Sequence, residues 1–309
     1  NPNWSAPVLR VATTSFIVPV RVYDIDLASG ERTLLREQAV LGDYRPEEYV
    51  ERRDWAVAPD GARIPISIIH RAGLEFPAPT LLYGYGAYES SEDPRFSIAR
   101  LSLLDRGMVF AIAHVRGGGE LGKPWHDDGK MLKKRNTFSD FAAAADELVY
   151  SGWTTRDRLA ISGGSAGGLL IGATLNLRPD LCKAAILYVP FVDVINTMVD
   201  ESLPLTTGEF LEWGNPKKEA EYRYMLSYSP YDNIRATTYP NILVKTSYND
   251  SQVMYWEPAK YVAKMREVGK APSLIFKTNM AGGHGGSSGR FDVLRERAFD
   301  FAWLIQKLS

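Results

Sequence analysis

The chain has 309 residues, of which 45% are hydrophobic and 24% charged, and its formal net charge is −1. This near-neutral balance gives no reason to expect nucleic acid or an anionic membrane as a partner. The single cysteine, Cys182, excludes an internal disulfide and a cysteine-based metal site. One free cysteine suits a reducing compartment, so we expect a cytoplasmic protein. No apolar run in the sequence is long enough to cross a membrane.

Residues 1–42 are predicted to form short antiparallel β-structure. Their β-branched and aromatic runs show no helical period, and the predicted strands cover residues 8–12, 16–22, 22–25 and 33–35. A turn is expected at Ala28-Ser29-Gly30-Glu31. So few strands cannot form a core of their own. We therefore expect this segment to be the end of a larger β-domain whose remainder precedes the chain.

Residues 43–309 are predicted to form one α/β domain, in which apolar strands alternate with helices. The predicted strands are residues 64–70, 80–83, 108–115, 158–162, 184–189, 241–247 and 273–278. The predicted helices are residues 137–150, 166–177, 257–268 and 291–308, and a polar insertion covers residues 193–233. This alternation indicates a mostly parallel sheet with helices on both faces. Functional residues in such sheets gather at the carboxyl ends of the strands.

A candidate nucleophile lies at one of these strand ends. The segment Gly163-Gly164-Ser165-Ala166-Gly167 matches the pattern G-x-S-x-G, follows a predicted strand and opens a predicted helix. A strand that turns sharply into a helix crowds the residues two positions before and after its corner, where only glycine fits. The corner side chain then projects above the sheet at the positive end of the helix. This context predicts Ser165 as the nucleophile of an α/β-hydrolase fold.

A serine hydroxyl needs a base, and the chain has only four histidines. His70 and His114 lie in or at the end of apolar strands and are expected to be packed there, while His126 has no strand end to direct it. His284 follows the last predicted strand within a glycine-rich segment, so we expect it to be the base. Asp250, after the strand 241–247, is the preferred carboxylate to orient the base, with Asp193 as the alternative.

The tetrahedral intermediate of such a reaction needs donors for its oxyanion. The backbone N–H of Ala166, directly after the nucleophile, is one candidate. The loop Tyr83-Gly84-Tyr85-Gly86 supplies the second, through a backbone N–H or a tyrosine hydroxyl. The residues alone leave that choice open.

Several longer motifs accompany these candidates. They are Leu82-Tyr83-Gly84-Tyr85-Gly86, His114-Val115-Arg116-Gly117-Gly118-Gly119-Glu120, Gly163 to Gly168, Pro204-Leu205-Thr206-Thr207-Gly208-Glu209, Trp213-Gly214-Asn215-Pro216, Tyr228-Ser229-Pro230-Tyr231-Asp232-Asn233, Tyr255-Trp256-Glu257-Pro258-Ala259-Lys260 and Gly283-His284-Gly285-Gly286. With them the chain resembles the prolyl oligopeptidase family of serine peptidases, and within it the oligopeptidase B group. The resemblance extends over essentially the whole chain.

This resemblance implies a triad of Ser165, Asp250 and His284, with the Tyr85 hydroxyl as the second oxyanion donor. It implies a serine oligopeptidase that cleaves short peptides after Arg or Lys through an acyl-enzyme, without a metal or organic cofactor. It also implies a β-propeller that covers the active site, of which residues 1–42 would be the last strands.

The resemblance further implies which residues select the substrate. Glu209 occupies the position of a glutamate that pairs with the cation of the substrate, and a carboxylate is a strong partner for guanidinium. Asp93 matches one of two acidic positions that favour a basic residue at the next substrate position. Glu212 and Gln252 are further candidate substrate-binding residues.

Three positions depart from the pattern of the family. Leu211 stands where a second acidic residue is usual, Arg95 replaces an acidic residue, and Gln252 stands where an arginine often contacts the substrate backbone. These changes put a preference for paired basic residues in doubt. A prolyl oligopeptidase, an acylaminoacyl peptidase, a carboxylesterase and a catalytically silent interaction domain are the alternatives.

Overall fold

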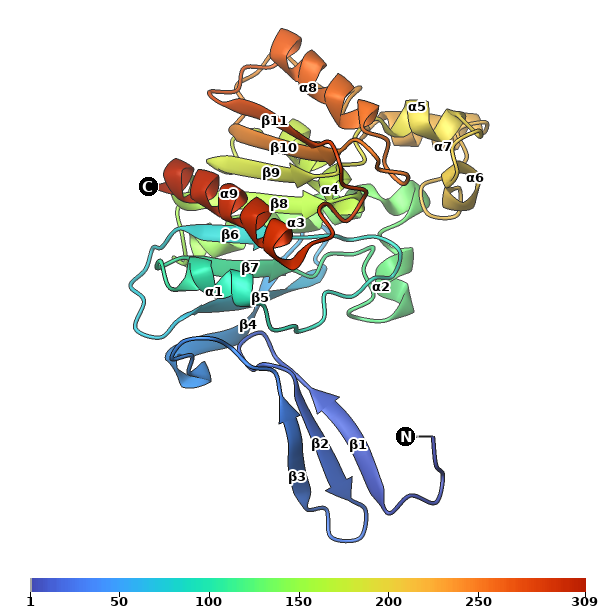
Figure 1. Cartoon of the computed structure of the whole chain (residues 1–309). Helices are drawn as coiled ribbons and strands as arrows, with labels where there is room; N and C mark the ends of the chain where they lie inside the picture. The colour runs from blue at the N-terminus through green and yellow to red at the C-terminus, as the bar shows by residue number, and fades with distance from the viewer. Residues whose placement is uncertain (1) are drawn as a thin grey trace.

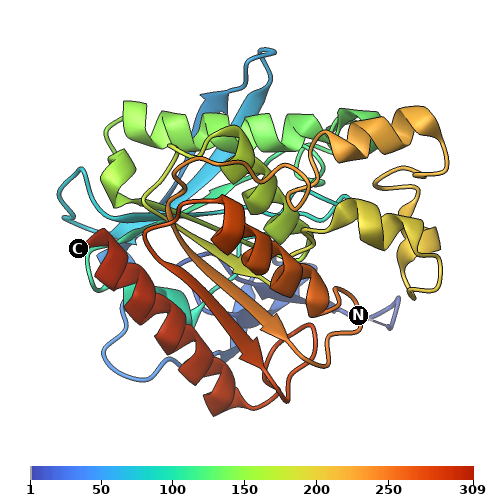
Figure 2. The same cartoon turned by 90° about the horizontal axis from the view of Figure 1, so that it is seen from above.

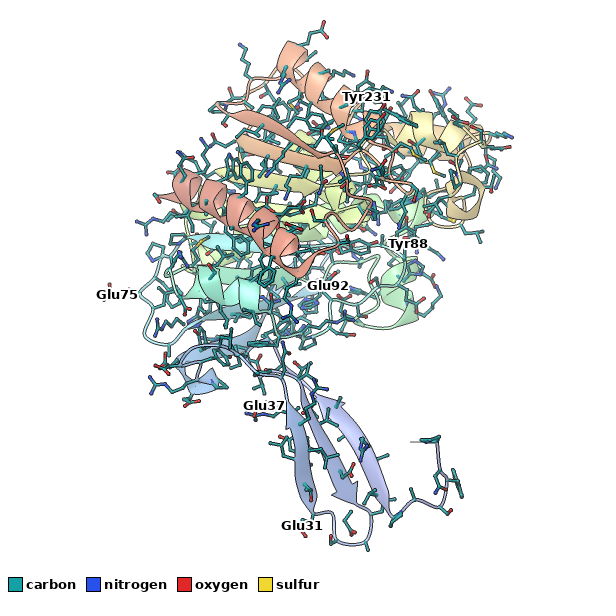
Figure 3. The ribbon with its side chains drawn as sticks, in the orientation of Figure 1. Glu31, Glu37, Glu75, Tyr88, Glu92 and Tyr231 are labelled. Carbon is teal, nitrogen blue, oxygen red and sulfur yellow. The ribbon has the colours of Figure 1, made fainter. Side chains whose placement is uncertain are left out.

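The computed structural model describes residues 2–309 and has two parts, a small N-terminal sheet and an α/β body (Figure 1). The N-terminal sheet contains β1 (Val8–Thr13), β2 (Arg21–Asp26) and β3 (Arg32–Glu37), paired antiparallel in this order. Every residue of β3 is exposed, so this sheet has no core of its own. Glu31 marks the free tip of the sheet, and Glu37 lies nearer to the body (Figure 3).

The predicted strand over residues 16–22 is wrong in its first part. Residues 15–18 form a turn, in which the Ser15 hydroxyl accepts hydrogen bonds from the backbone N–H groups of Ile17 and Val18. Phe16 is buried in a small core with Ile69 and Leu104 of the body. The apolar residues that suggested a strand therefore serve as an anchor between the two parts.

The α/β body is built on a sheet of eight strands, whose order is β11-β10-β9-β8-β6-β7-β5-β4. The strands are β4 (Tyr49–Val57), β5 (Arg63–Arg71), β6 (Thr80–Tyr83), β7 (Val109–Ala113), β8 (Leu159–Gly164), β9 (Ala184–Tyr188), β10 (Asn241–Ser247) and β11 (Leu274–Asn279). Neighbours from β7 to β11 pair parallel, whereas β5 pairs antiparallel with both β4 and β7. The predicted strands of the body are confirmed to within two residues at each end.

The strand β4 and the helix α1 (Ile98–Leu104) were not predicted from the sequence. β4 is the edge strand of the sheet, and its centre is the charged run Glu51-Arg52-Arg53-Asp54. An edge strand that faces water on one side carries polar residues and lacks the continuous apolar run of a central strand. α1 is a short helix of 7 residues, which shows too few turns for a clear period.

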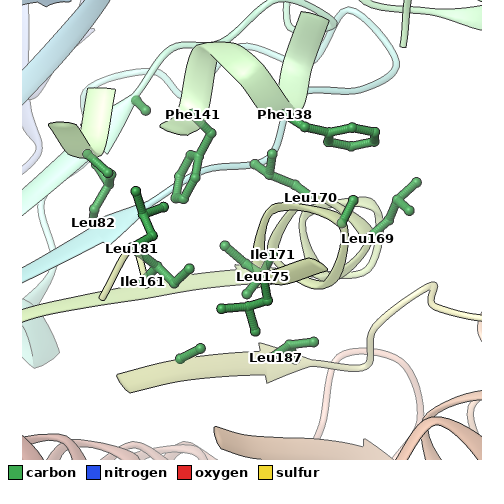
Figure 4. Packing of buried hydrophobic residues seen from close by; sticks show 14 of the residues in the cluster. Leu82, Phe138, Phe141, Ile161, Leu169, Leu170, Ile171, Leu175, Leu181 and Leu187 are labelled. Carbon is green, nitrogen blue, oxygen red and sulfur yellow. The ribbon is translucent and has the colours of Figure 1, made fainter. Parts of the chain in front are cut away.

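Helices cover both faces of the sheet (Figure 2). α3 (Arg135–Tyr150), α4 (Ala166–Leu177) and α8 (Trp256–Val268) contribute to the larger core, and α1 and α9 (Arg290–Leu308) pack on the opposite face. α4 is buried along almost its whole length between α3 and the strands. Figure 4 shows Phe138 and Phe141 of α3 beside Leu169 and Leu170 of α4. This burial makes α4 a rigid base for the residue that precedes it.

The predicted polar insertion contains three short helices at the carboxyl edge of the sheet, α5 (Val194–Val199), α6 (Thr206–Glu209) and α7 (Glu219–Leu226). The remaining helices are α2 (Lys123–Asp127) and the 3₁₀ turns Pro46–Glu48, Met131–Lys133 and Arg156–Arg158. Within residues 2–309, no helix has the length and apolar character needed to cross a membrane.

Replacing Phe141 with Ala tests the packing of α3 on α4. The ring is fully buried, so its loss is expected to lower the free energy of unfolding by about 3–5 kcal/mol. Urea unfolding with an unchanged m value measures the effect. Tyr150→Ala at the exposed end of the same helix is the control, and it should change stability by less than about 0.5 kcal/mol. Equal losses in both variants would contradict this account of the core.

Candidate active site

Ser165 stands at the corner between β8 and α4, as predicted. β8 ends at Gly164, α4 begins at Ala166, and Ser165 has a φ of 56°. A positive φ is rare for a residue with a side chain and is stable only where the surroundings impose it. The backbone N–H of Ser165 donates to the Tyr188 carbonyl at 2.8 Å, and its own carbonyl accepts from Phe191 at 3.1 Å. The corner is thus held from both sides by the neighbouring strand and its loop.

The glycines around Ser165 allow very close backbone contacts. A β-carbon on Gly163 would lie 2.3 Å from the carbonyl oxygen of Gly167, and one on Gly167 would lie 2.7 Å from the carbonyl oxygen of Gly84. A β-carbon on Gly168 would lie 2.4 Å from the Cα of Pro190. The predicted crowding two positions before and after the serine is therefore present. The same contacts press the corner against the loop that follows β6.

Asp250 and His284 meet at the carboxyl ends of adjacent parallel strands. Asp250 follows β10 and His284 follows β11, and His284 Nδ1 lies 2.7 Å from Asp250 Oδ2. The side chain of Asp250 is fully buried, and its second oxygen accepts backbone N–H groups of Gln252 and Val253 at 2.9 and 3.0 Å. A carboxylate held in this way fixes the orientation of the imidazole.

The alternative carboxylate, Asp193, has other partners. Its side chain accepts from Asn196 at 2.6 Å and forms an ion pair with Lys260. Two other histidines are engaged in structural contacts, as expected. His70 bonds the carbonyl of Arg71, and His114 lies between Ser67 and Glu120.

Ser165 and His284 lie on two cavities that flank the corner. Ser165 lines a cavity of about 350 Å³, here called the Ser165 pocket. His284 and Gly164 line a second cavity of about 510 Å³ between the sheet and α9. No hydrogen bond joins Ser165 to His284, although both residues are described. Bonds of this kind are often long in a free enzyme and tighten when substrate binds.

The loop after β6 brings Tyr85 to the same pocket. Its ring lines the Ser165 pocket, and burial, assisted by Glu209, raises the pKa of Tyr85 to about 12. The hydroxyl therefore remains a proton donor at neutral pH. The N–H of Ala166 is at the first position of α4, where no carbonyl of the helix can accept it. Both predicted oxyanion donors thus belong to groups that line one pocket.

Two buried contacts hold the Tyr85 loop in place. Lys134, which is 1% exposed, donates from Nζ to the carbonyl of Gly86 and lies 4.9 Å from the centre of the Trp213 ring. Burial lowers the pKa of Lys134 to about 8. On the other side, a β-carbon on Gly117 would lie 2.1 Å from the carbonyl oxygen of Gly86. Neither residue was recognised from the sequence as part of the site.

Glu209 is the only charged side chain among the described residues that line the Ser165 pocket. Its Oε2 accepts from the Tyr88 hydroxyl at 2.6 Å and from Trp213 Nε1 at 2.7 Å. The other walls are mainly apolar or aromatic, and Gln252 also lines the pocket. A single carboxylate in such surroundings is suited to a long cationic side chain. The sequence did not reveal these partners: Tyr88 is 121 positions away in the chain, and the motif that contains Trp213 does not show where its indole N–H points.

The other candidate substrate-binding residues lie elsewhere. Glu212 does not line the pocket; its carboxylate is buried behind the wall, bonded to the backbone N–H of Tyr88 at 2.9 Å and to His126 Nε2 at 2.8 Å. Asp93 and Arg95 are exposed on the segment before α1. Leu211 points to solvent with 78% of its surface exposed. In the part of the chain that the structure describes, no cluster of His, Cys, Asp and Glu is suited to a metal ion.

Replacing Gly163 with Ala tests the steric constraint at the corner. The added methyl group has no room beside Gly167, so we expect a loss of about 1–3 kcal/mol in stability, together with a displaced Ser165. Urea unfolding and the rate of labelling by a fluorophosphonate measure both effects. Gly208→Ala in α6 is the control, since a β-carbon there has no neighbour within 4 Å. The constraint is refuted if both variants behave like the unmodified protein.

Comparison with known proteins supports this assignment of the fold. Residues 94–309 match the family described as the prolyl oligopeptidase family. The chain is 50% identical to dipeptidyl aminopeptidase BI of Pseudoxanthomonas mexicana, covering 100% of this chain and 43% of the relative. It is 46% identical to protease 2 of Moraxella lacunata, covering 99% of this chain and 47% of the relative.

Solved structures give the same result. The structure of oligopeptidase B from Leishmania major superposes with a TM-score of 0.94 at 46% identity, covering 99% of this chain and 43% of that one. Oligopeptidase B from Trypanosoma brucei, solved with covalently bound antipain, gives a TM-score of 0.95 at 46% identity, covering 99% of this chain and 44% of that one. The chain therefore spans less than half the length of these relatives. On its sequence and its α/β-hydrolase fold, it belongs to the prolyl oligopeptidase family of serine peptidases.

Proposed function

We propose that this chain is the catalytic part of a serine oligopeptidase that hydrolyses short peptides after Arg or Lys. The observation that carries the proposal is the hydrogen bond of 2.7 Å between His284 and buried Asp250, beside a strained serine corner. The similarity to proteins called protease 2 and oligopeptidase B supports the reaction class. The reaction needs no metal or organic cofactor.

In the proposed reaction, Ser165 Oγ attacks the carbonyl carbon of the scissile bond while its proton passes to His284 Nε2. Asp250 stabilises the imidazolium that forms. The Tyr85 hydroxyl and the Ala166 N–H donate to the oxyanion. The proton then moves to the amide nitrogen as the C–N bond breaks, which leaves an acyl-enzyme. Water repeats these steps on the acyl-enzyme and releases the acid. Substrate binding must bring Ser165 and His284 within hydrogen-bonding distance.

The proposed specificity rests on the Ser165 pocket. Its aromatic walls accommodate the methylene groups of Arg or Lys. Glu209 Oε1 is available to the cation because Tyr88 and Trp213 both donate to Oε2. A prolyl side chain carries no charge that could pair with the Glu209 carboxylate. We propose supporting rather than direct roles for Glu212, and a contact with the substrate backbone for Gln252. The exposed pair Asp93 and Arg95 has opposite charges, which favours no basic residue at the next position.

A dipeptidyl aminopeptidase is the second candidate, favoured by the 50% identity to a protein of that name. Such an enzyme would require a free substrate amine two residues before the cut. The two candidates share the same acyl-enzyme chemistry. They differ in whether the enzyme must bind a free amino terminus of the substrate.

We also propose that residues 1–42 belong to a β-propeller and residues 43–309 to the catalytic domain. The exposed three-stranded sheet needs further strands to be covered, and the relatives are more than twice as long as this chain. The buried free thiol of Cys182 suits the cytoplasm as the location.

Ser165→Ala tests the chemistry. Removal of the nucleophile should abolish labelling by a fluorophosphonate and lower kcat by about a millionfold. Both are measured in the natural gene product, with circular dichroism to confirm folding. If the Ala variant retains peptidase activity, another residue is the nucleophile. If the unmodified protein is neither labelled nor active, the chain is a catalytically silent interaction domain instead.

Glu209→Gln tests the specificity. Loss of one charged partner of the guanidinium should lower kcat/KM for an arginyl peptide amide by about 10–100-fold, with little effect on a simple ester. Glu219→Gln, an exposed carboxylate of α7, is the control. Prolyl, acylaminoacyl and dipeptidyl substrates complete the panel. Equal turnover of prolyl and arginyl substrates would overturn the proposal, and a strict need for a free amino terminus would favour the aminopeptidase.

A further inference from the structure

Glu257 is a buried carboxylate that the reaction does not use. It lies in the first turn of α8 and is 1% exposed. Its Oε2 accepts the backbone N–H of Asp193 at 3.1 Å, and its Oε1 accepts the hydroxyl of Thr197 at 2.6 Å. No lysine or arginine forms an ion pair with Glu257 in the described part of the chain. A carboxylate is costly to bury in this way, so its place in the fold calls for an explanation.

These hydrogen bonds join two walls of the Ser165 pocket. Thr197 and Met198, in α5, line one wall. Gln252, Val253 and Met254 line another wall, on the loop that leads from Asp250 into α8. The backbone N–H of Glu257 donates to the carbonyl of Met254 at 3.0 Å, so its main chain is part of this second wall. The side chain of Glu257 extends to the first wall, where it accepts the Thr197 hydroxyl.

The connection continues to the helix that carries Glu209. The Thr206 hydroxyl donates to the carbonyl of Thr197 at 2.9 Å, and Thr206 begins α6, which ends at Glu209. A shift of Thr197 would therefore move α6 as well. In this way the position of Glu209 depends on a contact made at the far side of the pocket.

We propose that Glu257 is a positioning residue that holds α5 and α6 against the loop of Asp250 and thereby sets the geometry in which the pocket binds a cationic side chain. This inference rests on the proposed function, since it concerns the same pocket. It assigns to Glu257 no contact with substrate and no role in proton transfer.

The charges around Glu257 add a dependence on pH. Burial raises the pKa of Glu257 to about 7, and the carboxylate of Asp193 contributes to the increase, while the bonds from Thr197 and the backbone oppose it. Asp193 is itself paired with Lys260 of α8, and Lys260 and Lys264 both lie over the ring of Tyr231, labelled in Figure 3. As the pH rises through about 7, Glu257 becomes ionised and accepts the Thr197 hydroxyl more strongly. We therefore expect the pocket to bind a cation more tightly at pH 8 than at pH 6.

Glu257→Gln provides the test, with agmatine as the guanidinium probe in the natural gene product. In the amide an NH2 group replaces one carboxylate oxygen, so the side chain can no longer accept both the Asp193 N–H and the Thr197 hydroxyl as it does now. The Kd of agmatine and the KM of an arginyl substrate should therefore rise about tenfold, the effect of one hydrogen bond to a charged group. Labelling by a fluorophosphonate should change less than about twofold, because Ser165 and the pair of Asp250 and His284 are untouched. The part of the pH dependence of agmatine binding that is due to Glu257 should disappear. Glu267→Gln, exposed on the same helix, is the matched control.

Thr197→Val gives an independent test, since it removes the hydroxyl and preserves the shape of the side chain. Its effect on agmatine binding should resemble that of Glu257→Gln, and the double variant should be no weaker than the weaker single variant. Additive effects, or unchanged agmatine binding in Glu257→Gln with labelling intact, would overturn the inference. If Glu257→Gln does not fold, Thr197→Val decides alone: unchanged agmatine binding in it refutes the connection. Failure of the proposed function is distinct, because the unmodified protein would then bind no agmatine or resist labelling.

Discussion

The steric constraint at the corner between β8 and α4 is the feature on which the rest of the candidate site depends. Gly163, Gly167 and the carbonyl of Gly84 approach one another so closely that no β-carbon fits between them. This contact allows the positive φ of Ser165 and joins the corner to the loop that carries Tyr85. Because α4 is buried along almost all of its length, the strain is supported by the main core.

The parallel sheet then brings together side chains that are far apart in the sequence. β8, β10 and β11 end at the same edge, so the loops that follow them converge there. His284 meets Asp250 because β11 pairs with β10, and the backbone N–H of Asn249 also donates to the carbonyl of Gly282, which holds the two loops together. The carboxylate that bonds His284 therefore follows the neighbouring strand.

Buried polar groups hold the pocket in shape from behind its walls. Glu212 bonds His126 and the backbone of Tyr88, Lys134 bonds the carbonyl of Gly86, and Glu257 bonds Thr197. Each is costly to bury, and each is satisfied only in one arrangement of the loops around it. Together they allow short insertion helices, which have little core of their own, to present Glu209 in a defined position.

The sequence by itself determined the strand order along the chain, the long helices and the serine corner, because apolar period and glycine spacing are local signals. It did not reveal the edge strand β4, whose centre is a charged run, or the anchoring role of Phe16. The residues alone favoured Asp250 but left Asp193 as an alternative, since both follow strands of the same sheet. The tertiary structure shows that Asp250 bonds His284, through the pairing of β10 with β11, while Asp193 is paired with Lys260. The partners of Glu209 and the place of Glu257 were likewise decided by packing between distant segments, which leaves no local pattern in the sequence.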